Sequence, residues 1–227
     1  MSRLLLLAAL SALVASAAPA AQTCTTTWQP EGAVWTSGDW ADADRWDNGV
    51  PTASDVACVF GEGSRGFTVT LDAPATVAGL VFGSTTASIA LQLDAELTVT
   101  GDGRLFGRDR IDGDLTLGGT FALDPGDLVR GGGTVTVLET GALVVRNQDG
   151  TNGGGYSAIG DGSAAGSPSE LRVLGTFEAY ESLWVRSAVV FDGATVRVFD
   201  DPDTGANLSP DFVTFHNGGQ FRASRST

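Results

Sequence analysis

The side chains that could carry chemistry are sparse in this sequence. All 13 basic residues are arginine, so the chain has no lysine, and it contains a single histidine, His216. Without an ammonium group, P-loop phosphate binding and Schiff-base chemistry are excluded. A single imidazole is too few for a multi-histidine metal site. His216 lies in Phe-His-Asn-Gly, where we expect the turn at the end of a strand.

Two acidic groups are the remaining catalytic candidates. Asp109, Asp112 and Asp114 lie beside Arg108 and Arg110, a mixture that a polysaccharide lyase of β-helical shape would use. The simpler interpretation is an outward-facing stripe of solvated charge that prevents edge-to-edge pairing of strands. We favour the stripe.

The second acidic group is the pair 200–201, an Asp-Asp dipeptide of the kind found in polygalacturonase-like enzymes. The other three motifs of those enzymes are missing from the sequence, as is the G-x-S-x-G motif of serine hydrolases. We therefore assign no catalytic residue and expect the protein not to be an enzyme. A polysaccharide lyase or glycoside hydrolase is the minor alternative.

Metal and cofactor sites are equally weakly indicated. Asp201, Asp203 and Asn207 partly imitate a calcium loop, but Gly205 stands where a third ligand belongs and Phe212 where the bidentate glutamate belongs. The three residues are a weak calcium candidate, and we expect no other cofactor. The segment 61–66 matches G-x-G-x-x-G, yet a strand pattern follows it, whereas a dinucleotide site needs a helix there. It therefore predicts a turn.

The overall charge excludes several classes of partner. Twenty-seven acids against 13 arginines give a net charge of −14. Nucleic acids and anionic lipid surfaces are bound through basic patches, so neither is an expected partner.

Residues 1–20 have the pattern of a secretory signal peptide. Arg3 precedes an apolar run from Leu4 to Val14, and Ala18-Pro19-Ala20 offers a cleavage site. The run is too short to span a bilayer, and no later stretch is long enough. We expect a secreted or cell-surface protein with no membrane span after cleavage.

The two cysteines are interpreted in that context. Cys24 and Cys58 are too few for a Cys-only zinc site, and an exported protein meets an oxidising compartment. We expect one disulfide that joins the mature N-terminus to the first strand. The alternative is two free thiols.

From residue 67 onward the pattern is that of short strands. Alternating apolar and β-branched residues recur, as in 97–100, 115–117, 134–137, 171–173 and 195–198, and glycines separate them. A period near 20 residues, with one unit per repeat, indicates a solenoid of parallel strands. An antiparallel β-sandwich is the alternative. The repetition is interrupted at 147–169, a Gly/Ser-rich insertion that is either an excursion or a weak coil with a short strand near 156–159.

The region 21–66 differs in composition. Trp28, Trp35, Trp40 and Trp46 fall close together among aspartates. Exposed, these four tryptophans could form a platform for sugar rings. Buried, they would cap the first coil, which every solenoid requires. We favour the cap and keep the glycan platform as the alternative.

The stretch Trp40-Ala-Asp-Ala-Asp-Arg-Trp46-Asp-Asn-Gly-Val-Pro51, followed by Asp55-Val-Ala-Cys-Val-Phe60, resembles a module of bacterial secreted surface proteins. That module has the pattern W-x-D-x-x-N-W-x-x-G-x-x-P, and Arg45 replaces its asparagine. The resemblance to adhesin-like and autotransporter-passenger-like proteins implies a right-handed parallel β-helix. It also implies a role at the bacterial cell surface.

Three functional hypotheses follow. The first is a non-catalytic, secreted or cell-surface structural or adhesive β-solenoid. The second is a carbohydrate-binding module that uses the N-terminal aromatic residues, and the third is a polysaccharide-active enzyme. The candidate partners are surface glycans or other components of the cell envelope.

Overall fold

The computed structural model of the chain describes residues 22–30, 35–63, 65–107, 109–124, 128–130, 133–145, 157–159, 170–179, 183–185, 188–200, 212–216 and 220–225. β-Strand is the dominant secondary structure in this part of the chain. The one helical element in it is a short 3-10 helix, η1 (Ala43–Arg45). The predicted signal peptide, 1–20, lies outside the described residues.

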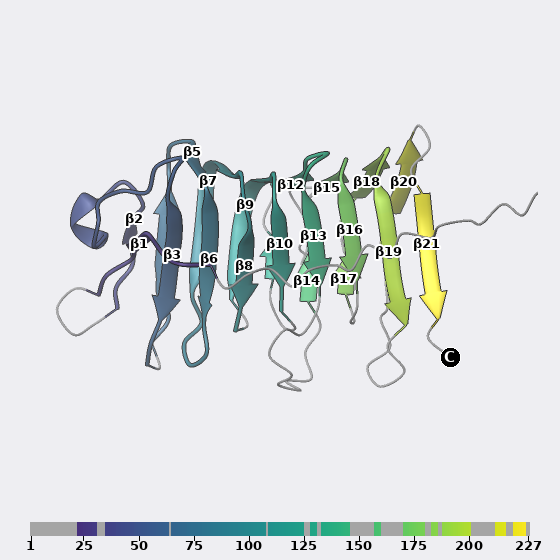
Figure 1. Cartoon of the computed structure of the whole chain (residues 1–227). Coiled ribbons are helices and arrows are strands. Elements are labelled where there is room, and N and C mark those ends of the chain that lie inside the picture. Colours follow the sequence, from purple (N-terminus) through teal and green to yellow (C-terminus); the bar gives the residue numbers. More distant parts are fainter. Residues whose placement is uncertain are drawn as a thin grey trace, which may run out of the picture.

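The strands form stacked, parallel ladders that run the length of the molecule (Figure 1). Within the described residues, one sheet has nine strands, all paired in parallel. We call it face 1. Its strands, in spatial order, are β1 (Thr26–Thr27), β3 (Val56–Gly61), β6 (Gly79–Ser84), β8 (Gly103–Phe106), β10 (Thr120–Leu123), β13 (Ala142–Val145), β16 (Thr176–Ala179), β19 (Thr195–Asp200) and β21 (Gln220–Arg225).

The second sheet is folded into two further faces. Its long strand β7 (Ala90–Val99) pairs with β4 (Thr68–Leu71) through its first half and with β5 (Ala75–Val77) through its second half. The register between β7 and β9 (Arg110–Leu117) shifts between Leu93 and Leu97, where the sheet bends. Face 2 continues from the first halves through β11 (Leu128–Arg130), β14 (Ser157–Ile159) and β17 (Leu183–Val185), and it begins at β2 (Gly38–Asp39). Face 3 continues from the second halves through β12 (Thr134–Val137), β15 (Glu170–Val173), β18 (Ala188–Asp192) and β20 (Phe212–His216).

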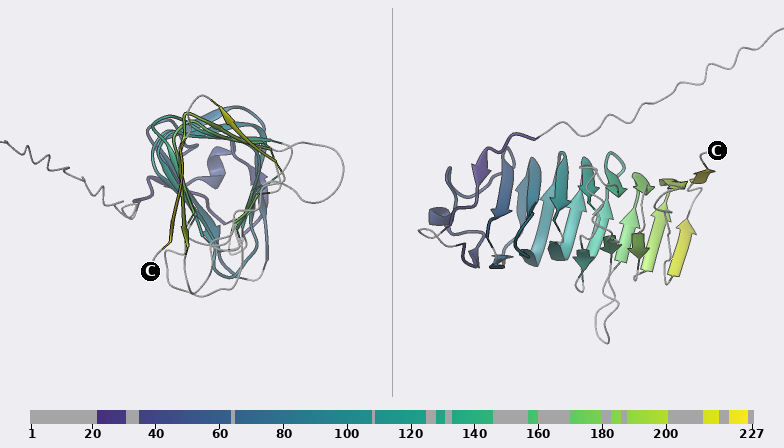
Figure 2. Two further views of the ribbon diagram at one scale, coloured as in Figure 1. Left: turned by 90° about the vertical axis from the view of Figure 1, so that its right-hand side faces the viewer. Right: turned by 90° about the horizontal axis from the view of Figure 1, so that it is seen from below.

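The chain visits the faces in a fixed order. After β3 on face 1 come β4 on face 2, β5 on face 3 and then β6 on face 1 again, and later coils repeat the order. Seen along the axis, the coils superpose in one closed outline (Figure 2). The predicted β-solenoid is confirmed, and parallel pairing excludes the antiparallel sandwich. The right-handedness of the coil stays a prediction.

Strand alternation directs one set of side chains inward, where they stack in columns from coil to coil. On face 1, Leu80 pairs with Gly103 and Gly103 with Phe121. Leu80 and Phe121 are fully buried. A Cβ on Gly103 would lie 2.3 Å from the Phe121 ring, so the glycine leaves the space that the large ring fills. On face 3 the buried column is Val77, Val99, Leu117, Val137, Val173 and Phe191.

The structure changes one boundary expected from the sequence and bears on the open question of the Gly/Ser-rich insertion. The stack begins before residue 67, because β1 and β3 already belong to face 1 and β2 pairs with β4. Within the Gly/Ser-rich insertion 147–169, β14 (Ser157–Ile159) is a strand of face 2, paired with β11 and β17. The short strand expected near 156–159 is therefore present, and the rest of the insertion lies outside the described residues.

Candidate functional site

Three of the four N-terminal tryptophans pack together at the end of the solenoid. Trp28, Trp40 and Trp46 are between 0% and 4% exposed. The Trp46 ring meets Trp28 edge-on, with centroids 5.2 Å apart, and Trp40 at 4.9 Å. The Trp46 indole N–H donates to the carbonyl oxygen of Trp40 at 2.8 Å. These rings cover the apolar end of the first coil, as the capping interpretation requires.

The residues between the tryptophans hold this arrangement in place. Asp42 caps η1, since its carboxylate accepts the backbone N–H of Asp44 at 3.1 Å. Asp47 accepts the backbone N–H of Thr27 at 2.7 Å, and the Asn48 amide donates to the Thr25 carbonyl at 2.8 Å. The polar positions of the tryptophan-rich motif thus join the cap loop to β1.

Arg45 takes part in the same cap. Its guanidinium lies over the Trp28 ring, 4.9 Å from the centroid, and donates to the hydroxyl and the carbonyl of Thr36, both at 2.8 Å. The side chain is 8% exposed. A cation held over an aromatic face inside a cap is stabilising.

The four-tryptophan glycan platform is not formed. A sugar stacks on an exposed aromatic face, and Trp28, Trp40 and Trp46 present none because they are buried in the cap. Trp35 is partly exposed and stacks on Phe67, with centroids 5.7 Å apart and the ring planes 13° from parallel. The platform hypothesis fails because the solenoid end needs these apolar rings as its cover.

The predicted disulfide is present. Cys24 and Cys58 are bonded, with Cα atoms 5.7 Å apart, and they are separated by 34 positions. Cys58 is on β3, so the bridge fixes the segment before β1 to face 1.

A cleft lies next to the cap, at the corner where β4 turns into β5. We call it the corner cleft. Its volume is about 390 Å³, and it is lined by Trp40, Ala41, residues 50–53 and residues 71–76. Sequence reasoning did not find it, because its walls come from three segments that meet only through the docking of the cap onto the first coil. A Pro at 51 and another at 74 were the available local signals of tight turns there.

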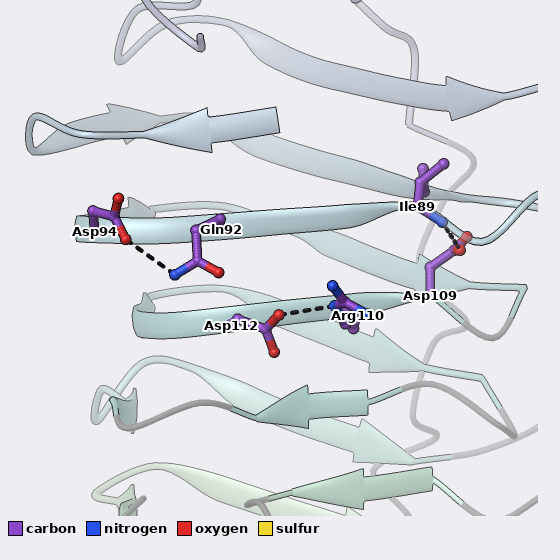
Figure 3. Close-up of polar contacts among 6 residues, drawn as sticks. All are labelled: Ile89, Gln92, Asp94, Asp109, Arg110 and Asp112. Carbon is purple, nitrogen blue, oxygen red and sulfur yellow. Dashed lines mark hydrogen bonds and ion pairs between the residues drawn. The ribbon is translucent and has the colours of Figure 1, made fainter. Parts of the chain in front are cut away.

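The acidic residues at β9 have separate partners, and Figure 3 shows Asp109 beside Ile89 and Asp112 beside Arg110. Asp109, just before β9, lies on the inward side of the strand's alternation, whereas Asp112 on β9 lies on the outward side and is partly exposed. Asp109 is fully buried, and its carboxylate accepts the backbone N–H of Ile89 at 2.6 Å. Asp112 forms an ion pair with Arg110 at 2.9 Å. Asp114 accepts the backbone N–H of Thr134 at 2.7 Å on the outer face.

The charged-stripe interpretation is therefore wrong for Asp109. Burial raises the pKa of its carboxyl to about 6, and hydrogen bonds from the backbone at Ile89 and Ser84 oppose this rise. The alternation that makes Ile111 inward also makes Asp109 inward, so this signal was in the sequence. Burial of a carboxylate runs against its usual surface preference, which is why the interpretation failed.

The other sequence candidates give mixed outcomes. The segment 61–66 joins β3 to β4 without a helix among its described residues, and Gly63 has φ +84°, so the turn prediction is confirmed. His216 is the last residue of strand β20. Asp201, Asp203 and Asn207 lie outside the described residues, as does Arg108. The described part of the chain has no group of three or more metal-binding side chains.

No protein-family model, curated protein or solved structure matches the chain. The fold alone therefore defines the class: a parallel β-solenoid with a tryptophan cap and one disulfide. No helix in the described residues is both long enough and apolar enough to cross a membrane.

Proposed function

We propose that this protein is an exported, non-catalytic β-solenoid that serves as a structural or adhesive module at the bacterial cell surface. The observation that carries the proposal is the continuous stack of parallel coils on three faces, closed at one end by buried tryptophans. Such a stack is stabilised by neighbouring coils and presents long regular surfaces, as extended binding scaffolds do.

Export is supported by the disulfide and by the signal-peptide pattern of residues 1–20. Disulfides persist in oxidising compartments and are rare in the reducing cytosol. The tryptophan-rich segment that resembles surface-protein modules supports a bacterial surface location.

A non-catalytic role is supported by how the described charges are used. Arg110 pairs with Asp112 on one strand, Arg172 with Glu170 on another, and Arg197 on β19 with Glu178 on β16. These pairs lie along or between neighbouring strands, where opposite charges stabilise the sheet. Asp109 is engaged by backbone N–H groups. Each of these groups thus has a role in the fold.

Export is tested by expressing the full chain in a bacterium and comparing it with a variant lacking residues 4–14. We expect the wild-type protein outside the cytoplasm, oxidised, and beginning at Ala21 by N-terminal sequencing. The deletion variant should stay inside the cell. Reduced wild-type protein in the cytosol with Met1 retained would contradict the proposal.

Adhesion and catalysis are tested with the exported protein. Cells displaying the chain should bind to polysaccharide-coated or host-cell surfaces better than cells without it. Reducing-sugar and unsaturated-uronate assays on a panel of polysaccharides should give no turnover. Turnover of any polysaccharide would overturn the non-catalytic part of the proposal. Equal binding by cells with and without the displayed chain would overturn the adhesive part.

A further inference from the structure

We propose that the corner cleft binds one neutral sugar residue of a surface glycan. This inference rests on the adhesive function proposed above and names the chemistry of the partner. The ligand would lie beside the tryptophan cap, in the cleft that Trp40 and residues of the first coil line together. It would not stack on exposed tryptophan rings.

The size of the cleft suits one ring. Its volume of about 390 Å³ lies at the lower end of small-molecule sites, which span roughly 300–1,000 Å³. Its walls are held in place by a hydrogen bond on one side and by strand pairing on the other. On one side, Thr52 is held by Asp55, which accepts the Thr52 backbone N–H at 2.9 Å. On the other side, β5 is fixed by its pairing with β7. A preformed site of this kind loses little entropy on binding.

The walls combine apolar and polar groups as a sugar requires. Trp40, Pro51 and Leu71 supply buried apolar surface, and Pro74 supplies exposed apolar surface. Asp72 and Thr76 add an exposed carboxylate and an exposed hydroxyl on the same corner. A pyranose ring has an apolar C–H face and hydroxyl groups at its rim, so it can satisfy both kinds of wall.

The acidic residues in and near the cleft favour a neutral sugar over a negatively charged one. Among the residues lining the cleft, all of which the structure describes, only Asp72 is charged. The exposed Asp39 and Asp42 flank Trp40 and Ala41 in the sequence, and the nearby Arg45 guanidinium is engaged with Thr36 and Trp28. Uronates and sialic acids would meet like charge here, which is unfavourable.

Trp40 can report on the cleft, because it is one of the residues that line it. The indole N–H of Trp40 is buried and has no hydrogen-bond partner within the described protein, whereas Trp46 donates to the Trp40 carbonyl. Because this N–H is closed to solvent, we use its NMR resonance as a reporter of the neighbouring cleft and not as a contact of the sugar.

The direct test is titration of the purified, disulfide-bonded chain with methyl glycosides of glucose, galactose, mannose and N-acetylglucosamine. Methyl glucuronide and sialic acid serve as charged probes. Binding is followed by calorimetry and by the indole N–H resonances in nitrogen-15 NMR spectra. We expect saturable binding of at least one neutral glycoside, with the Trp40 indole resonance shifting and no tighter binding of a charged probe.

Matched variants locate the site. Asp72→Asn should weaken binding about tenfold and Thr76→Val about threefold, as expected for loss of a charged and a neutral hydrogen-bonding group. Their controls are Asp94→Asn and Thr98→Val. Thr98 pairs with Thr76, and Asp94 follows Leu93, the partner of Leu71, so both controls occupy the same positions one coil further along. Trp40→Phe keeps an aromatic ring at this position and identifies the Trp40 indole resonance.

The outcomes separate this inference from the proposed function. If no neutral glycoside binds, or if Asp72→Asn and Asp94→Asn have equal affinities, the sugar site is overturned, and adhesion of displaying cells would still uphold the adhesive role. If a neutral glycoside binds to the wild-type protein and binding is lost in the cleft variants, the sugar site is supported whether or not displaying cells adhere. Failure of the displaying cells to adhere would then overturn only the adhesive role. The Asp72 and Thr76 variants decide the question if Trp40→Phe does not fold, because both side chains are exposed.

Discussion

Burial of Asp109 makes the stability of the fold depend on pH. The carboxyl has a folded pKa of about 6 against a reference value of 3.8. Between these pH values the folded state binds more protons than the unfolded state, so the free energy of unfolding falls as pH rises and levels off above the folded pKa. The contribution is present below the unfolded pKa and lost above the folded one.

We therefore expect Asp109→Asn to stabilise the protein at pH 7 and to have little effect at pH 4. A neutral amide avoids the cost of burying charge, and its oxygen can still accept from Ile89. The gain at pH 7 should be at most about 3 kcal/mol, because one pKa unit corresponds to about 1.4 kcal/mol. Urea denaturation of the variant and wild type at both pH values measures it.

Asp94→Asn makes the same change of side chain at an exposed position and is the control for the Asp109 variant. A stability difference between wild type and Asp109→Asn that is the same at pH 4 and pH 7 would show that the folded carboxyl titrates normally.

At the scale of elements, the inward columns depend on matched sizes in neighbouring strands. Gly103→Ala places a methyl group 2.3 Å from the Phe121 ring, so we expect a loss of about 1–3 kcal/mol from overpacking. Phe121→Leu alone should also destabilise. In the double variant the two losses should be less than additive, because the smaller side chain makes room for the methyl group. Urea midpoints of the four proteins give the coupling, and simple additivity would contradict contact between the two positions.

The tryptophan cap is a second element whose role can be measured. Trp46→Ala removes the ring that contacts both Trp28 and Trp40, so we expect a loss of about 3–5 kcal/mol. Because coils of a solenoid are stabilised by their neighbours, hydrogen exchange should quicken first in β1 to β4. The control is Trp35→Ala, a partly exposed ring that should cost less. Equal losses, or exchange that quickens uniformly along the chain, would count against a cap.

At the scale of the whole molecule, the disulfide joins the N-terminal segment to the stack. Reduction should lower the free energy of unfolding by about 4 kcal/mol, the chain-entropy value for a loop of this length. The double variant Cys24→Ala/Cys58→Ala should match the reduced protein and should not respond to reductant. Urea denaturation with and without dithiothreitol provides the comparison. If reductant leaves the free energy of unfolding of the wild-type protein unchanged, the disulfide does not make this contribution to stability.

Much of the fold could be predicted from the sequence because a solenoid depends on short patterns that repeat along the chain. Alternation in segments such as 134–137 fixes which side chains point inward, and the recurrence of similar segments fixes how coils stack. The pairing of Cys24 with Cys58 was predictable because the chain has two cysteines. The same alternation indicated that Asp109 is buried, but aspartate is so commonly exposed that the sequence was interpreted the other way.

By itself, then, the sequence determined the class of fold and turns such as 61–66, since these depend on near neighbours along the chain. It determined the disulfide because the chain has two cysteines. Only the tertiary structure decided that Trp28, Trp40 and Trp46 are buried whereas Trp35 is partly exposed, that β7 and β9 bend to make three faces, and that a corner cleft lies beside Trp40. These features depend on how segments distant in sequence pack against one another. Local periodicity carries no information on that packing, which follows from closing the coil and covering its open end.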